Sequence, residues 1–244
     1  MPDGWTRKEK KVRARLIESA EIAPNVRHFV FDAPGCEAFA FVPGQWVSLS
    51  AVLGGHEITR AYSIASAPSG GNRFELCLNR VEGGMFSPYL FALSPGDSID
   101  VRAPMGDFVL RDPLRETIFV ATGTGVAPFR SMLHARLNPQ LNNNSPPLTL
   151  LLGVRYERDL LYRQEFETMA RQYSQFRFRP TLTRPEPGWA GATGRVQTHL
   201  AEVLRERRDL DVFLCGMRAM VDDLRRILKE MGFDRKQIRY ERYD

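Results

Sequence analysis

The hydrophobic residues of positions 1–111 fall into short runs that are rich in β-branched and aromatic side chains. Gly and Pro residues separate these runs, as in Ala33-Pro34-Gly35 and Val42-Pro43-Gly44, and this punctuation is typical of strands joined by turns. The predicted strands span residues 12–17, 26–32, 46–50, 60–64, 73–79 and 98–103. Six strands at this spacing indicate a closed barrel or a sandwich, and a short helix is expected at 87–92.

From residue 112 onward, continuous apolar strands alternate with helical patterns. Strands are predicted at 117–121, 148–154, 176–183, 212–215 and 238–243, and helices at 129–137, 162–173, 198–205 and 219–231. Buried strands that alternate with amphipathic helices favour a parallel sheet covered on both faces. The sequence therefore predicts two domains, a β-rich domain at 1–111 and an α/β domain at 112–244, with the boundary near Arg111-Asp112-Pro113.

Charge differs between the two predicted domains. Residues 1–111 hold 12 Lys and Arg against 12 Asp and Glu, whereas residues 112–244 hold 22 against 17, so the excess of +5 lies in the second half. A basic surface attracts anionic partners such as nucleic acid, phosphorylated ligands or an acidic protein. Nucleic-acid binding is disfavoured, because the sequence shows no recognised module and no basic stripe with interleaved aromatic residues. The basic stretch from Arg7 to Arg15 is expected to be a solvated tail or first strand.

Other features narrow the class of protein. No apolar run approaches the roughly 18 residues that a membrane helix needs, and the basic N-terminal stretch has no apolar core of a secretory signal. Cys36, Cys77 and Cys215 are far apart, which argues against a disulfide framework, a zinc site or a four-thiolate iron–sulfur cluster. The four histidines are scattered as well: His28, His56, His134 and His199. We expect surface or satisfied histidines, no metal site and a reduced, cytoplasmic protein.

A glycine loop, Thr122-Gly123-Thr124-Gly125-Val126-Ala127-Pro128, directly follows the apolar strand predicted at 117–121. A glycine loop between a parallel strand and a helix exposes backbone N–H groups at the positive end of the helix dipole, where a pyrophosphate binds. Pro128 suits the first helical turn, in which its missing N–H costs nothing. The third glycine of the dinucleotide fingerprint is absent, so the loop alone fits an ordinary tight turn equally well.

Two further segments in the first half carry possible ligand-binding groups. In Arg60-Ala61-Tyr62-Ser63, strand alternation places Arg60 and Tyr62 on one face, where an arginine can hold a phosphate and a tyrosine can stack on a ring. Taken alone, this segment is more often a strand with ordinary surface residues. Gly83-Gly84-Met85-Phe86-Ser87 leads into the predicted helix and fits either an anion-binding helix start or a tight turn with an N-cap serine.

Taken in order, these segments resemble the ferredoxin–NADP⁺ reductase family of flavoproteins. The resemblance covers nearly the whole chain, from about residue 12 to residue 243. The segments that carry it are Pro43-Gly44-Gln45-Trp46, Arg60-Ala61-Tyr62-Ser63-Ile64-Ala65-Ser66, Gly84-Met85-Phe86-Ser87, Gly123-Thr124-Gly125-Val126-Ala127-Pro128-Phe129-Arg130-Ser131, Leu160-Leu161-Tyr162 with Glu165-Phe166, Cys215-Gly216-Met217 and Glu241-Arg242-Tyr243.

The resemblance implies an N-terminal antiparallel barrel that holds FAD and a C-terminal α/β domain that holds NAD(P)H. It implies catalytic roles near flavin N5 and the nicotinamide for four residues: Ser63, Cys215, Glu241 and Tyr243. The cofactor-binding residues that it implies are Arg60, Ala61, Tyr62, Ser63, Gly83, Gly84, Met85, Phe86, Ser87, Thr122, Gly123, Thr124, Gly125, Val126, Pro128, Arg155, Arg158, Arg184, Arg195, Cys215, Gly216, Met217 and Tyr243. Because nicotinamide C4 must come within about 3–3.5 Å of flavin N5, a tyrosine stacked on the flavin would have to move in each turnover.

The choice between NADPH and NADH depends on the arginines of the second half. Arg184 and Arg195 resemble the 2′-phosphate site of bacterial NADPH-using members, and Arg155 and Arg158 are placed to assist. Carboxylates flank Arg158 on both sides and would suit a ribose hydroxyl, as NADH enzymes prefer. The balance favours NADPH over NADH.

The expected function is therefore electron transfer between NADPH and an acidic carrier, ferredoxin or flavodoxin, by a monomeric flavoprotein. An alternative with the same chemistry is an NADH-dependent reductase component that serves an oxygenase or a cytochrome b5-like acceptor. A flavin-binding electron-transfer subunit without nicotinamide activity is disfavoured, because the glycine loop at 122–128 and the pair Arg184 and Arg195 are both present.

Overall fold

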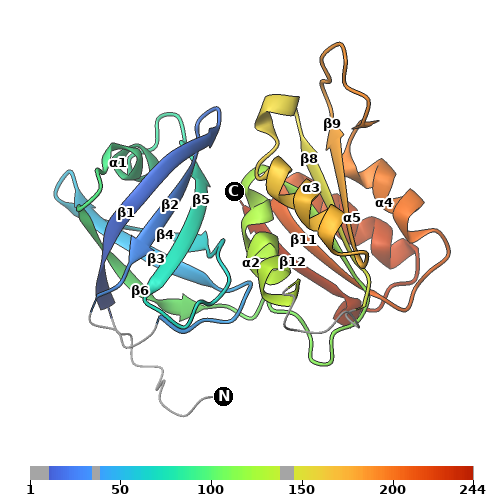
Figure 1. The fold of residues 1–244 in the computed structure, drawn as a ribbon, viewed down its shortest axis with the longest axis horizontal. Helices are drawn as coiled ribbons and strands as arrows, with labels where there is room; N and C mark the ends of the chain where they lie inside the picture. Colours follow the sequence, from blue (N-terminus) through green and yellow to red (C-terminus); the bar gives the residue numbers. More distant parts are fainter. Residues whose placement is uncertain (1–10, 35–38, 138–145, 244) are drawn as a thin grey trace.

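The computed structural model describes residues 11–34, 39–137 and 146–243, and these form two sheets that lie side by side (Figure 1). The first sheet is antiparallel and has the strand order β4-β3-β6-β1-β2-β5. Its strands are β1 (Lys11–Ala23), β2 (Val26–Asp32), β3 (Trp46–Leu53), β4 (His56–Ser63), β5 (Arg73–Asn79) and β6 (Ser98–Met105). A helix, α1 (Phe86–Ala92), interrupts them.

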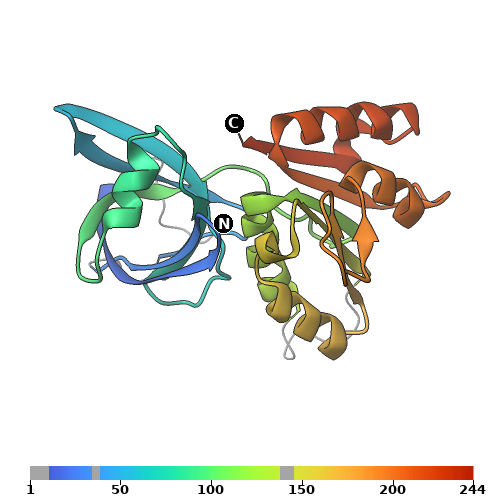
Figure 2. The ribbon, with the colours of Figure 1, turned by 90° about the horizontal axis from the view of Figure 1, so that it is seen from above.

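The first sheet closes on itself just beyond the end of β4. An antiparallel bridge joins Ile64 to Leu76 on β5, and the Ala65 N–H donates to the Glu75 carbonyl at 2.8 Å. The strands consequently curl around one interior, as Figure 2 shows. Alternate residues of the strands fill this interior, and Phe31 and Phe74 stack there with ring centroids 5.5 Å apart. The predicted N-terminal antiparallel barrel is confirmed.

The second sheet is parallel throughout, in the order β10-β9-β8-β7-β11-β12. Its strands are β7 (Thr117–Thr122), β8 (Leu148–Val154), β9 (Phe176–Leu182), β10 (Ala192–Thr193), β11 (Asp211–Met217) and β12 (Ile238–Tyr243). The chain starts with β7, moves outward through β8 and β9, and then returns to the other side of β7 with β11. This reversal places a topological switch point at the carboxyl ends of β7 and β11, where open α/β sheets bind ligands.

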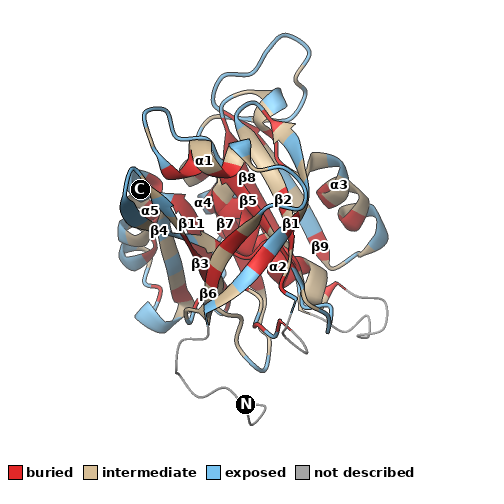
Figure 3. Cartoon of the chain, turned by 90° about the vertical axis from the view of Figure 1, so that its left-hand side faces the viewer, coloured by how far each residue is buried: buried red, intermediate tan, exposed pale blue. Residues whose placement is uncertain are grey.

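Helices cover both faces of the parallel sheet, as predicted. They are α2 (Ala127–Arg136), α3 (Arg163–Gln172), α4 (Val196–Leu204) and α5 (Arg218–Glu230), with short 3₁₀ turns η1 (Gly123–Val126), η2 (Glu157–Asp159) and η3 (Arg235–Gln237). Along β7, Phe119 packs with Phe129 on the side of α2 and α3, whereas Ile118 and Val120 pack with the side chains of α4 and α5. The middle strands are therefore buried on both sides, as the red colour in Figure 3 shows.

The structure departs from the predicted elements where a strand is polar or very short. Strand β1 continues to Ala23, past residue 17, and pairs with β2 through two register irregularities. Strand β10 was not predicted, because its two residues carry no hydrophobic run. Ser87 is not a helix cap: α1 begins at Phe86, and the Ser87 hydroxyl accepts the Val81 N–H at 2.8 Å.

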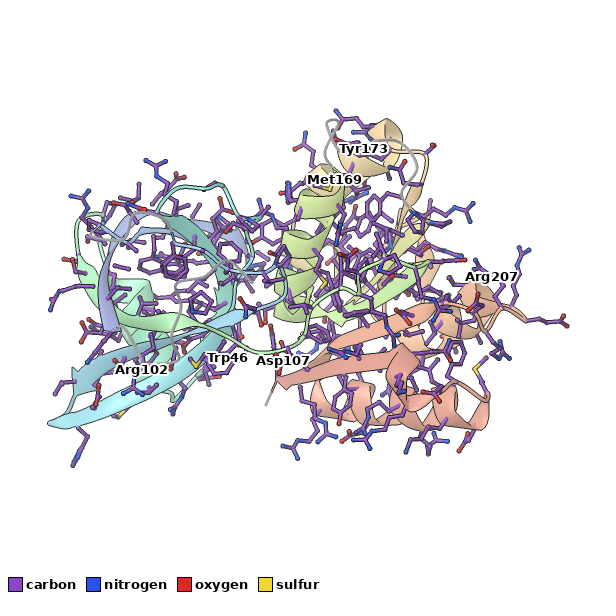
Figure 4. All side chains as sticks on the ribbon, turned by 90° about the horizontal axis from the view of Figure 1, so that it is seen from below. Trp46, Arg102, Asp107, Met169, Tyr173 and Arg207 are labelled. Atoms are coloured by element: carbon purple, nitrogen blue, oxygen red, sulfur yellow. The ribbon has the colours of Figure 1, made fainter. Side chains whose placement is uncertain are left out.

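The connection between the two sheets runs from β6 to β7, close to the boundary between the domains. Trp46 and Asp107 lie near this boundary (Figure 4), and a Cβ on Gly106 would lie 2.7 Å from the Trp46 ring nitrogen. The domain boundary at 111/112 falls within this connection and stays a prediction. Cys36 and the basic residues 7–10 lie outside the described residues. None of the described helices is long and apolar enough to cross a membrane.

Candidate active site

The glycine loop and the end of β11 form the wall of the switch point. A Cβ on Gly125 would lie 2.3 Å from the Cys215 carbonyl oxygen, and a Cβ on Gly216 would lie 2.3 Å from the Thr122 hydroxyl oxygen. Gly216 also has φ +136°, which favours glycine. The Met217 N–H donates to the Thr122 hydroxyl at 3.1 Å. The two segments approach too closely for a side chain at Gly125 or Gly216, so they form a tightly packed floor at the switch point.

The four predicted catalytic residues meet beside this floor, although they come from different domains. The Tyr243 hydroxyl donates to the Ser63 hydroxyl at 2.6 Å, and the Ser63 hydroxyl donates to Glu241 Oε2 at 3.3 Å. Cys215 is fully buried and pairs with Glu241 across β11 and β12. We call Ser63, Cys215, Glu241 and Tyr243 the Ser63 junction. It joins the last residue of β4 in the barrel to the carboxyl ends of β11 and β12 in the parallel sheet.

Burial changes the protonation of the Ser63 junction. It raises the pKa of Glu241 to about 7, although the hydrogen bond from Ser63 acts in the opposite direction. Burial also raises the pKa of the Cys215 thiol and of the Tyr243 phenol well above their usual ranges. Thiol and phenol are thus uncharged near neutral pH, and Glu241 is the group at the Ser63 junction that exchanges a proton there.

The barrel residues with predicted FAD contacts surround Tyr62. Its ring stacks near that of Phe86, with centroids 6.3 Å apart, and burial raises its pKa to about 12. Arg60 is exposed, as is Ala61, and the Arg60 guanidinium donates to the Thr59 carbonyl at 2.8 Å. The structure therefore brings the β4 segment and the start of α1 together.

The turn before α1 leaves apolar surface uncovered. Gly83 has φ +70°, and the Gly84 N–H donates to the Val81 carbonyl at 3.2 Å, which closes the turn. Val81 is 51% exposed and Met85 is 54% exposed, values that are high for apolar side chains. This uncovered patch lies next to the buried ring of Phe86, on which Tyr62 packs.

The predicted arginines lie at the carboxyl ends of β8 and β9. The Arg184 N–H donates to the Arg155 carbonyl at 2.8 Å, so these two residues are neighbours. Arg195 is the residue before α4, and the preceding Gly194 N–H donates to Leu182 at the end of β9. Arg155, Arg184 and Arg195 are exposed, and none of them pairs with a carboxylate among the described residues.

Arg158 differs from the other three predicted arginines. Its guanidinium forms an ion pair with Glu186 at 2.8 Å and lies 4.3 Å from the centre of the Tyr156 ring. The carboxylates on either side of it are also engaged: Glu157 pairs with Arg163, and Asp159 accepts the Tyr156 N–H at 3.1 Å. These contacts leave both carboxylates occupied, which weakens the case for a ribose-binding carboxylate at this position.

The sequence did not reveal one group of charged residues between the domains. His28 and His134 are scattered in the sequence, but the structure places them on either side of Glu75 and Glu165, with Arg130 between the two carboxylates. Arg130 and His134 are four residues apart on α2, a spacing that puts them on one helix face and was the available signal. Among the described residues, no group of three or more potential ligands is arranged to hold a metal ion.

Comparison with known families agrees with this architecture. The model of the oxidoreductase FAD-binding domain matches residues 13–110, which include the whole barrel from Arg13 onward. The model of the oxidoreductase NAD-binding domain matches residues 119–226, which include the glycine loop and the end of β11. The Ser63 junction thus lies between an FAD-binding domain and an NAD-binding domain.

Individual relatives extend the comparison to nearly the full chain. Ferredoxin–NADP reductase B of Sorangium cellulosum is 43% identical over 240 residues, which is 95% of this chain and 97% of the relative. NADH-cytochrome b5 reductase 1 of Laccaria bicolor is 31% identical over 89% of this chain and 72% of the relative. The crystal structure of the Amycolatopsis cytochrome P450 reductase GcoB superposes with a TM-score of 0.86 at 28% identity, over 99% of this chain and 73% of that one. The chain therefore belongs to the ferredoxin–NADP reductase family of FAD-dependent, nicotinamide-nucleotide-binding oxidoreductases.

Proposed function

We propose that this protein is a reductase that moves electrons between NADPH and a ferredoxin or a flavodoxin. The Ser63 junction carries the proposal, because it is the place where the FAD-binding and NAD-binding domains touch through Ser63, Glu241 and Tyr243. The similarity to ferredoxin–NADP reductase B supports the choice of carrier. We further propose that the protein acts as a monomer in the cytoplasm.

The barrel residues fit an FAD molecule. Arg60 offers an exposed guanidinium for the pyrophosphate, and the N–H groups of Phe86 and Ser87 at the start of α1 have no partner within the helix. Tyr62 would pack against the isoalloxazine, and Met85 and Val81 offer uncovered apolar surface. When bound, FAD supplies a two-electron acceptor for the hydride of nicotinamide C4 and a one-electron donor for the carrier protein.

The junction residues would orient the two rings and handle one proton. Gly125 and Gly216 contribute no side chains where the two segments pack together, and a planar nicotinamide would lie beside them. Tyr243 would cover the flavin and move aside when the nicotinamide arrives. Glu241 accepts the Ser63 hydroxyl at Oε2, and its pKa of about 7 allows its carboxyl group to release or take up a proton at neutral pH.

The arginines favour NADPH as the nucleotide. The 2′-phosphate carries nearly two negative charges, and Arg184 and Arg195 present guanidinium groups that no described carboxylate neutralises. Arg155 would assist them, whereas Arg158 is already paired with Glu186. NADH lacks the 2′-phosphate, so these arginines would not increase its affinity.

The alternative is an NADH-dependent reductase that serves an oxygenase or a cytochrome b5-like acceptor. It is supported by the similarity to NADH-cytochrome b5 reductase 1 and to the cytochrome P450 reductase GcoB. The proposed function and this alternative use the same FAD chemistry. They differ in the nicotinamide nucleotide and in the electron acceptor.

Anaerobic reduction of the purified protein by NADPH and by NADH tests the proposal. We expect a yellow protein with bound FAD, faster reduction by NADPH, and electron transfer to an acidic ferredoxin that weakens as salt is added. A preference for NADH together with salt-insensitive reduction of cytochrome b5 would favour the alternative. A colourless protein that takes up no FAD would refute both.

A further inference from the structure

Three of the sequence segments that resemble the family meet at a single side chain, Arg130 of α2. Its Nη1 donates to the Ala65 carbonyl at 2.9 Å and to Glu75 at 2.6 Å, and both of these partners belong to the barrel. Its Nε donates to Glu165 of α3 at 2.8 Å. The guanidinium also lies 4.6 Å from the centre of the Tyr162 ring. One side chain of the α/β domain is therefore bonded to both domains at once.

The next residue of α2, Ser131, also forms a hydrogen bond to the barrel. The hydroxyl of Ser131, which is fully buried, donates to the Ser66 carbonyl of the barrel at 2.5 Å. Helix α2 is well placed for this, because both views of the ribbon show it along the boundary, beside the barrel (Figures 1 and 2). We call Arg130, Ser131, Glu75, Glu165 and the backbone of residues 65–66 the Arg130 anchor.

One short segment of the barrel contributes to both the Arg130 anchor and the Ser63 junction. Ser63 is the last residue of β4, and Ala65, two residues later, accepts the bond from Arg130. Ala65 is fully buried and is itself tied to Glu75 by a backbone hydrogen bond. A displacement of the backbone at Ala65 would therefore displace Ser63 as well.

On the other side, the Arg130 anchor is continuous with the glycine loop. Arg130 follows Gly125 by five residues, and α2 begins directly where the 3₁₀ turn of the loop ends. Gly125 in turn rests against the backbone of Cys215. The Arg130 anchor thus connects the strand that would carry the flavin with the loop that would carry the nicotinamide, through short and largely buried segments.

The contacts of residue 130 with the two carboxylates require the charge and the shape of an arginine side chain. Glu75 and Glu165 are 29% and 27% exposed, come from different domains, and share one guanidinium that is 13% exposed. Without that guanidinium, Glu75 and Glu165 would keep only their histidine neighbours, His28 and His134, and would lose the cation that joins them across the two domains. A lysine supplies the charge but not the fork of donors that reaches both carboxylates and the Ala65 carbonyl.

We propose that Arg130 is a positioning residue, which holds the barrel and the α/β domain at the separation needed for hydride transfer at the Ser63 junction. This inference rests on the proposed function. Arg130 does not touch the reacting atoms, and it acts through Ala65 and Ser63 on one side and through the glycine loop on the other. An error of about 1 Å in such a separation lowers a rate by about 100-fold.

Four variants test the role of Arg130 in the FAD-loaded protein. Arg130→Met keeps an aliphatic stem without the guanidinium, Arg130→Lys restores the charge alone, and Ser131→Ala removes the neighbouring hydroxyl. Arg226→Met is the matched control, because Arg226 is exposed and pairs only within α5 in the described structure, with Asp223 and Glu230.

We expect the limiting rate of flavin reduction at saturating NADPH to fall about 10- to 100-fold in Arg130→Met, with an unchanged Kd for NADPH. The fall should be smaller in Arg130→Lys and in Ser131→Ala, and absent in the control. Reduction of the flavin by dithionite needs no nicotinamide and should be unchanged in all four variants.

Hydrogen exchange supplies a measurement that is independent of activity. Amides of residues 63–66 and 240–243 should exchange faster in FAD-loaded Arg130→Met than in the original protein, before any nucleotide is added. Should Arg130→Met fail to fold, Arg130→Lys and Ser131→Ala decide by the same two measurements.

A limiting rate and an exchange pattern like those of the original protein would overturn the positioning role of Arg130. A loss of rate explained entirely by lost FAD would overturn it too. Failure of the proposed function looks different: the original protein itself would then not be reduced by NADPH, and the exchange of residues 63–66 would still report whether Arg130 holds the domains together.

Discussion

The domains touch at the Ser63 junction through hydroxyl groups and one carboxyl, whereas at the Arg130 anchor they are joined by a half-buried guanidinium with several partners. Tyr243 contributes one hydrogen bond between the domains, to Ser63, so its departure breaks one hydrogen bond across the boundary. Arg130 holds Ala65, Glu75 and Glu165 together, and its removal would break its hydrogen bonds to all three. The difference shows how a two-domain enzyme can keep one contact easy to open while a neighbouring contact fixes the distance between its domains.

The largest effect is expected from a change at Gly125 of the glycine loop, which packs against Cys215 of the Ser63 junction. In Gly125→Ala, the new Cβ would lie 2.3 Å from the Cys215 carbonyl oxygen, and neither backbone can yield without moving β11. We expect the rate of flavin reduction by NADPH to fall about 100-fold, and the free energy of unfolding to fall by about 1–3 kcal/mol. Stopped-flow absorbance and urea unfolding measure the two effects.

Gly71→Ala provides the control for Gly125→Ala. Gly71 lies in the barrel, and the atom nearest to its added Cβ is a side-chain oxygen at 3.6 Å, which is ordinary contact. If Gly125→Ala is reduced as fast as Gly71→Ala, the Ser63 junction tolerates displacement and the contrast with the Arg130 anchor disappears.

A smaller effect, of the opposite sign for binding, is expected when Tyr243 is shortened. Tyr243→Ser would empty the space that the nicotinamide needs, so we expect NADP⁺ to bind about tenfold more tightly and to leave more slowly. Difference absorbance titration measures the affinity. Tyr240→Ser, a change at a 40% exposed tyrosine of the same strand, is the control and should leave the affinity as it is. Unchanged affinity in Tyr243→Ser would show that this tyrosine does not compete with the nicotinamide.

The smallest effect concerns the protonation of Glu241. Its pKa in the folded protein is about 7, above the usual value of 4.5, so the folded state binds the proton more tightly than the unfolded state. The stability that this proton contributes is fully present below pH 4.5 and is lost as the pH rises through 7. Relative to Glu241→Gln, we expect the free energy of unfolding to fall by about 1 kcal/mol between pH 6 and pH 8.

Urea unfolding at the two pH values measures the effect of Glu241. Glu230→Gln, a change at an exposed carboxylate of α5, controls for the loss of a carboxylate elsewhere on the surface. Equal pH dependence in Glu241→Gln and in the original protein would mean that the Ser63 junction does not store a proton.

Burial explains which strands could be predicted from the sequence. Strand β8 is buried along its whole length, and its unbroken apolar run gave its bounds correctly as residues 148–154. The second half of β1 is mostly exposed or half-buried and has no regular apolar alternation, so its extent was missed. Strand β10 is held by pairing with β9 over two residues, a long-range effect that no local pattern reports.

The parts of the site that depend on neighbouring residues could be predicted from the sequence, whereas contacts between residues far apart in the chain could not. The glycine loop after β7 could be located from its own residues, because a tight turn between a strand and a helix needs glycine there. The contact of Ser63 with Tyr243 spans 180 positions, and only the resemblance to the family suggested that the two residues meet. The spacing of Arg130 and His134 on α2 could be read from the sequence, but their carboxylate partners Glu75 and Glu165 could not, because ion pairs between elements have no fixed spacing.

The burial of Cys215 beneath Tyr243 has a consequence for chemical damage. The thiol is fully buried and uncharged, and alkylating reagents and peroxide attack exposed thiolates. If Tyr243 swings away in each catalytic cycle, the sulfur becomes accessible only during those intervals. Inactivation by iodoacetamide would then accelerate while the enzyme turns over. The rate of this inactivation would report the fraction of time that Tyr243 spends away from its place.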